Sequence, residues 1–387
     1  MRGRILVVDH RTPTPDRDSG SASTFSYLQI LSSAGFDVTF VPFDLTSAGR
    51  YTRAVERLGI RTVASPFAGA IGRLGSTMRE ALARKAQETI AREAARANLV
   101  LLYRAPLAAR VFDRLRAAAP KTKILFHPVD LHFLRMGREA KLSGDKTKAE
   151  AAAEMRAIEL DLVIRADAII VVSEYERGLL RELAPVAKAH HIPTLREVPQ
   201  RSSLAPLPVH RRDIVFIGGF EHTPNEDAVQ WFVREVWPLL RAKDFAGRFV
   251  IAGARMPESI ARLSSDSIEV RGYVDALGPL YDACRLSVAP VRYGAGIKGK
   301  IVSSISYGVP VVASSVAAEG TGLKHGEAIL VADTPEAFAD EIIRLSGDDE
   351  LWQRLSQNGY RAFTEKFSLE AGAPKLLSVI NGLLASG

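Results

Sequence analysis

The sequence predicts an α/β protein made of two tandem, Rossmann-like domains, each with a doubly wound parallel sheet. Three observations support this fold class. Short apolar runs rich in β-branched residues alternate with amphipathic, helix-like segments. A polar, proline-bearing stretch at 193–212 interrupts the alternation once, and the alternation then restarts. The length of 387 residues suits two or three ordinary domains.

The first domain is expected over residues 1–195. Its apolar runs are typical of buried parallel strands, because both faces of each run are apolar. A helical pattern at Ser76–Ala97 separates the second run from the third. The runs are Arg4–His10, Phe36–Phe43, Leu99–Tyr103, Lys123–His127 and Ala168–Ser173.

Residues 196–212 are the expected linker, and residues 213–367 the expected second domain. Residues 368–387 are expected to form a C-terminal helix, with its pattern at Leu369–Leu384, that packs back across the first domain. Two similar domains joined by one linker leave a cleft between them, which is a common place for a ligand. The strand-like runs of the second domain are Asp213–Gly218, Arg248–Ala252, Ser267–Tyr273, Leu286–Val291 and Pro310–Ser314.

Composition limits the partners and the compartment. The formal charge of +7 favours an anionic partner, with a nucleotide diphosphate, an anionic lipid and nucleic acid as the classes to weigh. Nucleic acid is disfavoured, since the basic residues are not interleaved with aromatic ones. The single cysteine, Cys284, is expected to be a buried structural thiol on a helix. Without a signal-like or membrane-spanning run, a cytoplasmic protein is expected.

The first strand leads into a long polar loop, RTPTPDRDSGSAST, at 11–24. Gly20 and Ser21 stand near the start of the first helix, where backbone N–H groups and hydroxyls favour an anion or a sugar hydroxyl. An ordinary capped loop is the alternative. Asp16 and Asp18 have the Asp-x-Asp spacing of a metal site beside a diphosphate. Such a pair does not normally occupy the first turn of a fold, so no metal is expected.

Three polar residues follow the strand that ends at His127. Asp130, His132 and Arg135 lie in the run HPVDLHFLR, at the carboxyl end of a parallel strand. A carboxylate, an imidazole and a guanidinium on one turn can position an acceptor hydroxyl or a charged ligand group. A purely structural histidine is the alternative for His132, and His127 is expected to be structural.

The stretch RYGAGIKGKIVSSISYGVPVVAS, at 292–314, has the features of a phosphate-binding loop. Gly294 and Gly296 stand between a strand and a helix, where glycine lets backbone N–H groups approach an anion. Lys298 and Lys300 add compact positive charges. Lys298 is expected to be an exposed loop residue that contributes little to folding.

Several motifs together resemble one enzyme family. They are DSGSAST at 18–24, IVFIGGFEHTPNEDAVQWF at 214–232, AAEGTG at 317–322 and GVPVVAS at 308–314. The chain is similar over nearly its whole length to the GT-B glycosyltransferases of family 4 (group 1), which are retaining and use nucleotide sugars. The motifs of the second domain are the specific ones.

The resemblance implies transfer of a sugar from a nucleotide diphosphate sugar to a glycan or lipid-linked acceptor, in surface polysaccharide assembly. It implies no cofactor and no bound metal, because basic residues and a helix N-terminus neutralise the leaving diphosphate. Asp130, His132, Arg135 and Lys298 are the expected catalytic residues. The residues expected around the donor are Gly20, Ser21, Gly219, Gly294, Gly296, Lys300, Ser303, Glu319 and Gly320.

The chain departs from the family pattern in two places. Tyr293 and Ser303 stand where the pattern commonly has glutamates for the donor sugar and the ribose. Residues 219–222 lack the basic pair that often follows the first strand of the second domain. The alternatives to a transferase are therefore a nucleotide-sugar epimerase and a non-catalytic protein that binds nucleotide sugars.

Arginines are frequent on the helical patterns between residues 50 and 123. Solvated helix faces explain most such residues. The other explanation is peripheral contact with an anionic membrane that holds a lipid-linked acceptor, since a surface cation contributes ~1 kcal/mol near the headgroups. The inner face of the cell membrane is accordingly a possible location.

Overall fold

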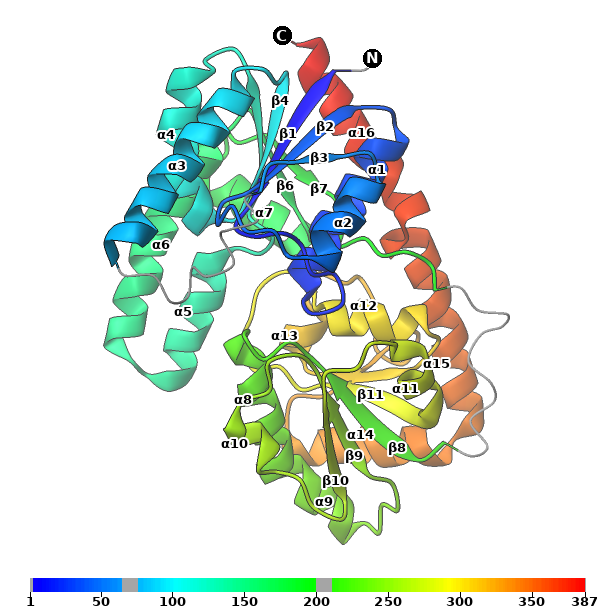
Figure 1. The fold of residues 1–387 in the computed structure, drawn as a ribbon. Helices are drawn as coiled ribbons and strands as arrows, with labels where there is room; N and C mark the ends of the chain where they lie inside the picture. The colour runs from blue at the N-terminus through cyan, green and yellow to red at the C-terminus, as the bar shows by residue number, and fades with distance from the viewer. Residues whose placement is uncertain (1–2, 65–75, 200–210, 387) are drawn as a thin grey trace. The chain divides into compact units, whose positions relative to one another are not determined.

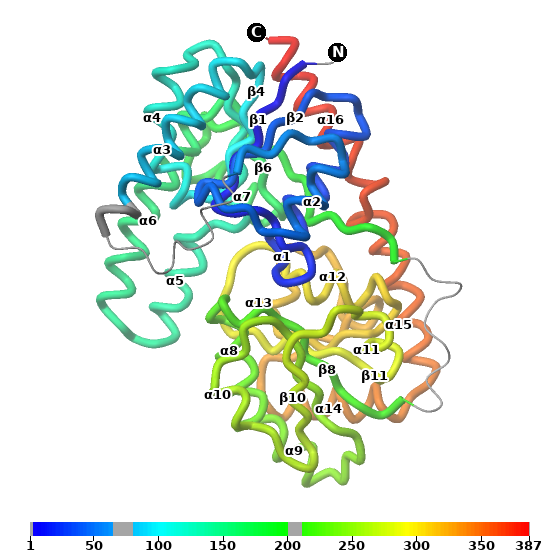
Figure 2. The backbone as a smooth tube through the Cα atoms, viewed as in Figure 1, coloured from blue at the N-terminus to red at the C-terminus, as the bar shows by residue number. Residues whose placement is uncertain are grey.

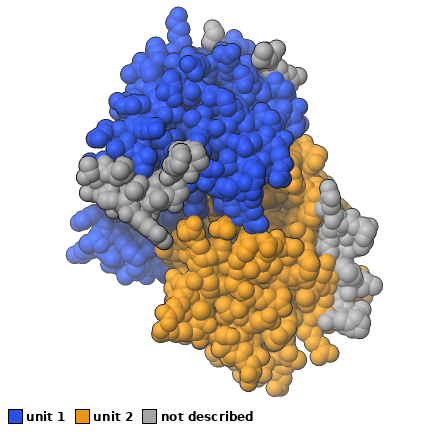
Figure 3. Space-filling model, viewed as in Figure 1, with its two compact units in different colours: residues 1–15, 20–193, 372–387 blue, residues 16–19, 194–371 orange. Residues whose placement is uncertain are grey.

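The computed structural model describes residues 3–64, 76–199 and 211–386. The chain forms two compact units, one of residues 1–15, 20–193 and 372–387, the other of residues 16–19 and 194–371 (Figure 3). Most of the linker predicted at 196–212 lies outside the described residues. The second unit thus includes a four-residue segment from the loop that follows the first strand.

The first unit contains a seven-stranded parallel sheet in the order β3-β2-β1-β4-β5-β6-β7 (Figure 1). All five predicted strands are present, since their runs of apolar residues are long enough to be buried on both faces. Two short strands were not predicted, because two or three mostly polar residues give no apolar run. The strands are β1 (Arg4–Asp9), β2 (Asp37–Pro42), β3 (Arg61–Thr62), β4 (Leu99–Tyr103), β5 (Lys123–His127), β6 (Ala168–Val171) and β7 (Ala189–His191).

Helices cover both faces of this sheet (Figures 1 and 2). The strand order reverses at β1, so α1 and α2 lie on one face and α3 and α4 on the other. The helices of this unit are α1 (Ser19–Ser33), α2 (Arg50–Arg57), α3 (Ser76–Ala94), α4 (Ala105–Ala118), α5 (His132–Ser143), α6 (Lys146–Arg165), α7 (Glu174–Leu183) and most of α16 (Leu369–Ala385).

The second unit contains a six-stranded parallel sheet in the order β10-β9-β8-β11-β12-β13. Its five predicted strands are also present, and the two-residue edge strand β13 was not predicted. The strands are β8 (Asp213–Ile217), β9 (Phe249–Ala252), β10 (Ile268–Gly272), β11 (Cys284–Ala289), β12 (Val311–Ala313) and β13 (Leu330–Val331).

The helices of the second unit surround this sheet. They are α8 (Thr223–Trp231), α9 (Trp237–Ala242), α10 (Glu258–Ala261), α11 (Leu277–Ala283), α12 (Gly299–Ser306), α13 (Ser315–Ala318), α14 (Pro335–Gly347) and α15 (Asp349–Ala362), with π-helical turns at Phe232–Val236 and Phe363–Phe367. The rings of Phe232 and Phe249 pack 4.6 Å apart in the core, and Trp237 and Phe338 contact Phe232. The aromatic side chains of three helical segments thereby anchor one face of the sheet.

The prediction that Cys284 lies on a helix is wrong. Helix α11 ends at Ala283, and Cys284 is the first residue of β11. The thiol is buried as predicted, and burial raises its pKa to about 12. The thiol is therefore an apolar core group at neutral pH.

Within the three described ranges, no helix combines the length and the apolar character needed to cross a membrane.

Candidate active site

Asp9, at the carboxyl end of β1, is a fully buried carboxylate with four hydrogen-bond donors. It accepts from Arg104 Nε at 2.8 Å, from Thr24 Oγ1 at 3.0 Å, and from His10 through both the backbone N–H at 2.7 Å and Nδ1 at 2.8 Å. Burial alone raises the pKa of this carboxyl, but Arg104 and His10 outweigh burial and hold the pKa well below its usual range. Asp9 is therefore ionised at all physiological pH values.

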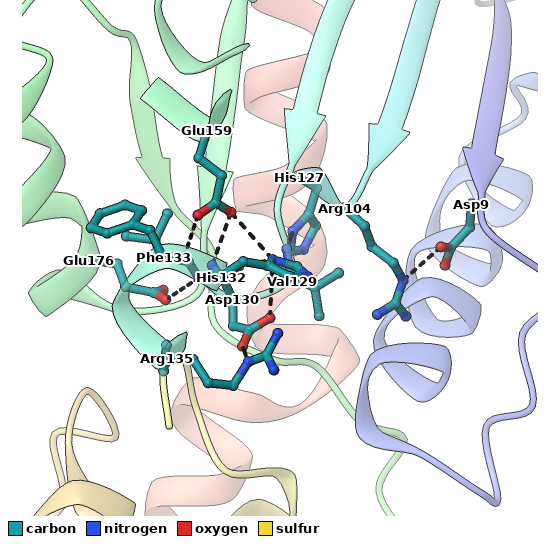
Figure 4. Close-up of polar contacts among 12 residues, drawn as sticks. Asp9, Arg104, His127, Val129, Asp130, His132, Phe133, Arg135, Glu159 and Glu176 are labelled. Atoms are coloured by element: carbon teal, nitrogen blue, oxygen red, sulfur yellow. Dashed lines mark hydrogen bonds and ion pairs between the residues drawn. The ribbon is translucent and has the colours of Figure 1, made fainter. Parts of the chain in front are cut away.

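Arg104 follows β4 directly, beside the end of β1, and has a left-handed backbone with φ of 62°. A side chain of any size is uncommon in this conformation, and the ion pair with Asp9 holds it there (Figure 4). A Cβ on Gly20 would lie 2.7 Å from Arg104 Nη2. A side chain at position 20, in the first turn of α1, would therefore displace the guanidinium of Arg104.

Helix α1 begins at Ser19, so the predicted loop at 11–24 is shorter than expected. Gly20 and Ser21 lie in the first turn of the helix, and Ser21 is buried. The first turn of α1 and Arg104 together form a positively polarised region at the carboxyl end of the sheet.

His127 ends β5 and is buried among aromatic rings. Its ring stacks on Tyr103 at 5.0 Å and lies 5.4 Å from the ring of Tyr27. Nδ1 accepts a hydrogen bond of 3.0 Å from the N–H of Val129, which places the proton of the neutral ring on Nε2. Burial, with Arg104 adding to it, lowers the pKa of His127 to about 3. These contacts support the predicted structural role of His127.

The neutral His127 makes stability depend on pH. A histidine whose pKa falls from 6.5 to about 3 on folding contributes stability that is complete above pH 6.5 and is lost as the pH falls through this window. We expect a loss of about 1.4 kcal/mol per pH unit from this residue. His127→Asn keeps an oxygen acceptor for Val129 and does not titrate. Its free energy of unfolding, measured with urea between pH 7 and 4, should therefore fall less steeply with decreasing pH than that of the unaltered protein. Equal slopes in both proteins would contradict the assignment.

Asp130, His132 and Arg135 come together in the first unit, as the sequence predicted from their spacing (Figure 4). Arg135 Nε donates to Asp130 Oδ2 at 2.9 Å. His132 Nδ1 lies 3.2 Å from the carbonyl oxygen of Asp130 and 3.8 Å from its Oδ1. The three side chains are each less than one-fifth exposed. Their catalytic role remains a prediction.

Two buried glutamates that the sequence analysis missed support this turn. Glu159, on α6, is fully buried and accepts the backbone N–H of His132 at 3.0 Å and that of Phe133 at 2.8 Å. Glu176, on α7, accepts the N–H of Leu131 at 3.3 Å. A sequence signal existed for Glu159, since it lies in helical register with the buried Ala152, Leu162 and Val163 of α6. An acidic residue in such an apolar stripe indicates a partnered, buried charge.

His132 is surrounded by acidic oxygens. Burial disfavours its charged form, but the carboxylates of Asp130 and Glu159 outweigh burial and raise the pKa of His132 above its ordinary value. Nδ1 lies 3.3 Å from Glu159 Oε1. The ring is therefore held in its charged form over a wider pH range than an ordinary histidine.

In the second unit, the glycine-rich loop leads into α12 at the carboxyl end of β11. Lys298 is the N-cap residue of α12, and its Nζ donates to the carbonyl oxygens of Ala295 at 3.0 Å and Gly296 at 2.8 Å. Gly296 has φ of 64°, and a Cβ on Gly294 would lie 2.9 Å from Lys298 Cε. The expectation that Lys298 is exposed is wrong, since the residue is 8% exposed. Its ammonium group folds back and fixes the shape of the loop.

Lys300, in the first turn of α12, contacts Asn225, a buried polar residue that the sequence analysis did not identify. Nζ donates to Asn225 Oδ1 at 2.5 Å and lies 4.6 Å from the centre of the Phe216 ring. Asn225 Nδ2 in turn donates to the carbonyl oxygen of Gly219 at 2.7 Å. Burial, together with the charge of Lys298, lowers the pKa of Lys300 to about 7. An anion bound nearby would restore the charge of this lysine.

The segment at 16–19 packs against the rest of the second unit. Arg196 Nη2 donates to Ser19 Oγ at 2.7 Å and to its carbonyl oxygen at 3.1 Å. A Cβ on Gly219 would lie 2.7 Å from the carbonyl oxygen of Arg17, and one on Gly299 would lie 2.1 Å from Ser19 Oγ. Gly219 and Gly299 are therefore glycines because this segment lies against them.

The Asp-x-Asp pair has protein partners here. Asp16 accepts a hydrogen bond from the Tyr273 hydroxyl, and Asp18 lies near enough to Arg196 to favour its charged form. Across the described parts of the chain, no group of three or more His, Cys, Asp or Glu side chains is arranged to hold a metal ion.

Ser303, Glu319 and Gly320 occupy other parts of the second unit. Ser303 is half-buried on α12 and lies close to the hydroxyl of Tyr281, whose ring stacks on Tyr307 at 5.0 Å. Glu319 is the C-cap residue of α13, and Gly320 follows it with φ of 76°. Their predicted contacts with a donor remain predictions.

Comparison with solved structures gives the fold of the whole chain. A sucrose-phosphate synthase from Thermosynechococcus elongatus is 18% identical, with a TM-score of 0.77 and coverage of 99% of this chain and 100% of that one. Anabaena HepE in complex with UDP-glucose is 13% identical, with a TM-score of 0.69 and coverage of 98% and 100%. A TarM variant from S. aureus, in complex with Fondaparinux, alpha-GlcNAc-glycerol and UDP, is 11% identical, with a TM-score of 0.73 and coverage of 98% and 100%.

Sequence comparison locates the family signal in the second domain. An uncharacterised 44.6 kDa protein in the cps region of Klebsiella pneumoniae is 23% identical over 168 residues, which are 41% of this chain and 43% of that protein. The model of the family "Glycosyl transferases group 1" matches residues 211–348, which include β8 to α14 and the lysine-bearing start of α12. The chain therefore has the two-domain GT-B fold, and the resemblance to the group 1 glycosyltransferases that its sequence shows is confirmed.

Proposed function

We propose that the protein transfers a sugar from a nucleotide diphosphate sugar to a glycan or lipid-linked acceptor, with retention of configuration. The observation that carries this proposal is the start of α12, where one lysine is the N-cap residue and a second lies in the first helical turn, within the segment that the family model matches. A helix N-terminus and adjacent cations stabilise the negative charge of a departing diphosphate. The chemistry of group transfer needs such stabilisation at the leaving group.

The second unit would hold the donor. Lys300 would bind phosphate oxygens directly. Its Nζ donates to Asn225 Oδ1, and Asn225 Nδ2 donates to the carbonyl oxygen of Gly219, so the ammonium group lies near this carbonyl. Lys298 would act on the diphosphate through the loop, because its Nζ fixes the carbonyls of Ala295 and Gly296 and so orients the loop amides. The acceptor hydroxyl would attack the sugar carbon as the diphosphate departs, without an enzyme nucleophile.

The first unit would position substrate hydroxyls. Arg135 and His132 bring positive charge to the end of β5, and Asp130 joins the two. A charge-assisted hydrogen bond to a sugar oxygen is roughly twice as strong as a neutral one. We assign these residues to binding and orientation of a substrate, in keeping with their partly exposed side chains.

The relatives support a nucleotide-sugar donor and a role in polysaccharide assembly. The HepE and TarM structures contain UDP-glucose and UDP respectively, and the K. pneumoniae relative is described by its place in the cps region. We propose UDP-sugars as the first donors to test, and a growing surface polysaccharide as the acceptor class.

A thermal shift screen tests the donor site. UDP, GDP, dTDP and CDP sugars are added to the protein with and without EDTA. We expect at least one of them to raise Tm in both conditions, because bound ligand stabilises the folded state by mass action. A shift that disappears completely in EDTA would contradict the proposed metal-independent binding, and no shift with any of the four would contradict the donor site.

One observation favours a second candidate, a non-catalytic protein that binds nucleotide sugars. Ser303 stands on α12 where the family pattern commonly has a glutamate, and it lies beside Tyr281. Measurement of donor hydrolysis and transfer separates the two candidates. Tight binding with neither reaction would favour the binding protein.

A further inference from the structure

The start of α5 is capped in an unusual way. Leu131, the N-cap residue, has no side chain that can accept from the first N–H groups of the helix, and the carboxylate of Glu159 from α6 takes this role. One oxygen accepts from the N–H of His132 and the other from the N–H of Phe133. Figure 4 shows the carboxylate between these groups. A serine or aspartate at position 131 would be the ordinary solution.

The same carboxylate also acts on the His132 ring. Oε1 lies 3.3 Å from His132 Nδ1, and this nitrogen also faces the carbonyl oxygen of Asp130 at 3.2 Å. The ring nitrogen surrounded by acceptors must carry a proton. Among the residues that the structure describes, Nε2 of His132 has no partner, and the side chain is 13% exposed.

A fully buried carboxylate is a costly way to cap a helix. Burying a charge is strongly unfavourable unless it is paired, whereas a local cap residue satisfies the same N–H groups at the surface. Glu159 also makes one interaction that capping the helix does not require. This interaction is its contact with Nδ1 of His132. The geometry therefore couples the helix start to the orientation of the imidazole.

We propose that Glu159 is a positioning residue for the transfer reaction, which fixes the His132 imidazole so that its Nε2–H donates to an oxygen atom of the substrate that the first unit binds. This inference rests on the proposed function. Glu159 does not touch the substrate, and it acts through His132. Arg135, whose Nε is held by Asp130, lies on the following turn of the same helix.

The inference has a pH signature. The charged groups that face His132 are Asp130 and Glu159, which favour the imidazolium, and Arg135, which opposes it. Donation from a charged ring is lost as the pH rises through the raised pKa of His132, so turnover should fall on the alkaline side. Removal of the Glu159 charge should move this fall to lower pH by about one unit or more.

Glu159→Gln is the test, and Glu154→Gln is its matched control, since Glu154 is an exposed residue of the same helix. NMR titration of the histidine C–H signals reads the pKa of His132 directly, with His132→Gln identifying the signal. The pH profile of kcat/KM is measured with whichever of the UDP, GDP, dTDP and CDP sugars is turned over, as hydrolysis or transfer.

We expect Glu159→Gln to lower the pKa of His132 and to shift the alkaline limb of kcat/KM, while Glu154→Gln changes neither. His132→Gln, which keeps the backbone N–H cap, should lower kcat/KM about 10- to 100-fold and flatten that limb. If Glu159→Gln does not fold, the pH profile of kcat/KM for His132→Gln alone tests the inference. Full activity of His132→Gln would then overturn it.

The two proposals fail in different ways. Turnover by the unaltered protein with unchanged pH profiles in Glu159→Gln and His132→Gln would overturn the positioning role alone. Neither binding nor turnover of any of the four sugar nucleotides by the unaltered protein would overturn the proposed function, and this inference with it.

Discussion

Replacing Asp9 with alanine is expected to lower the free energy of unfolding by about 3–5 kcal/mol, because it leaves a mostly buried guanidinium without its carboxylate partner. Arg104 is 20% exposed and its backbone is held at φ of 62° through the Asp9 contact. The N–H of His10 loses its side-chain acceptor as well, and the Thr24 hydroxyl keeps only the carbonyl oxygen of Gly20. Urea unfolding at pH 7, with the midpoint and the slope both measured, gives the value.

The double mutant cycle isolates the ion pair. Arg104→Met removes the guanidinium and keeps an unbranched side chain against Gly20, and the double variant Asp9→Ala/Arg104→Met should lose less stability than the two single losses added together. Additive losses would mean that the two residues do not stabilise each other. A loss below 1 kcal/mol for Asp9→Ala would show that water satisfies the guanidinium.

Lys298→Ala is expected to lower kcat/KM about 10- to 200-fold, because it removes the charge-assisted hydrogen bonding that holds the glycine-rich loop, which contributes roughly 1.5–3 kcal/mol in all. The burial of Lys298 changes what the sequence implied about folding. Its Nζ bonds two loop carbonyls, so Tm should fall as well. Steady-state kinetics with the identified donor, and a melting curve for each variant, measure the two effects.

Lys300→Ala is the matched control on the same helix. Lys300 bonds a side chain instead of the loop, so its removal should weaken donor binding with little effect on the loop. Lys298→Arg keeps the charge in a longer, planar group and should recover less than half of the lost activity, because the two carbonyls are placed for a compact ammonium. Full activity in both Lys298→Ala and Lys300→Ala would show that the loop only turns the chain.

The candidate site was predictable where it depends on local pattern. Asp130, His132 and Arg135 share one turn after a strand, and a turn at the carboxyl end of a parallel strand brings its residues to one edge of the sheet. The lysines at 298 and 300 were likewise placed by a strand, two glycines and a helix in sequence. Such short-range patterns are read directly from the order of residues.

The direction of each side chain was not predictable. Lys298 was expected to be exposed, but its ammonium bonds the carbonyls of its own loop. Gly20 and Gly219 were expected around the donor, and the sequence did not predict that a guanidinium and a backbone carbonyl from distant segments lie beside them. The space beside a glycine depends on what packs there, and the sequence around the glycine does not contain that information.

The sequence by itself determined the two parallel sheets, ten of the strands that the structure describes and the resemblance to group 1 glycosyltransferases, because alternation and apolar runs are local properties of the chain. Only the tertiary structure decided the partners of the buried charges. Asp9 meets Arg104 95 residues away, Glu159 meets His132 across two helices, and Lys300 meets Asn225 75 residues away. Such pairs form because a buried charge must find a partner, and the fold alone decides which residue is within reach.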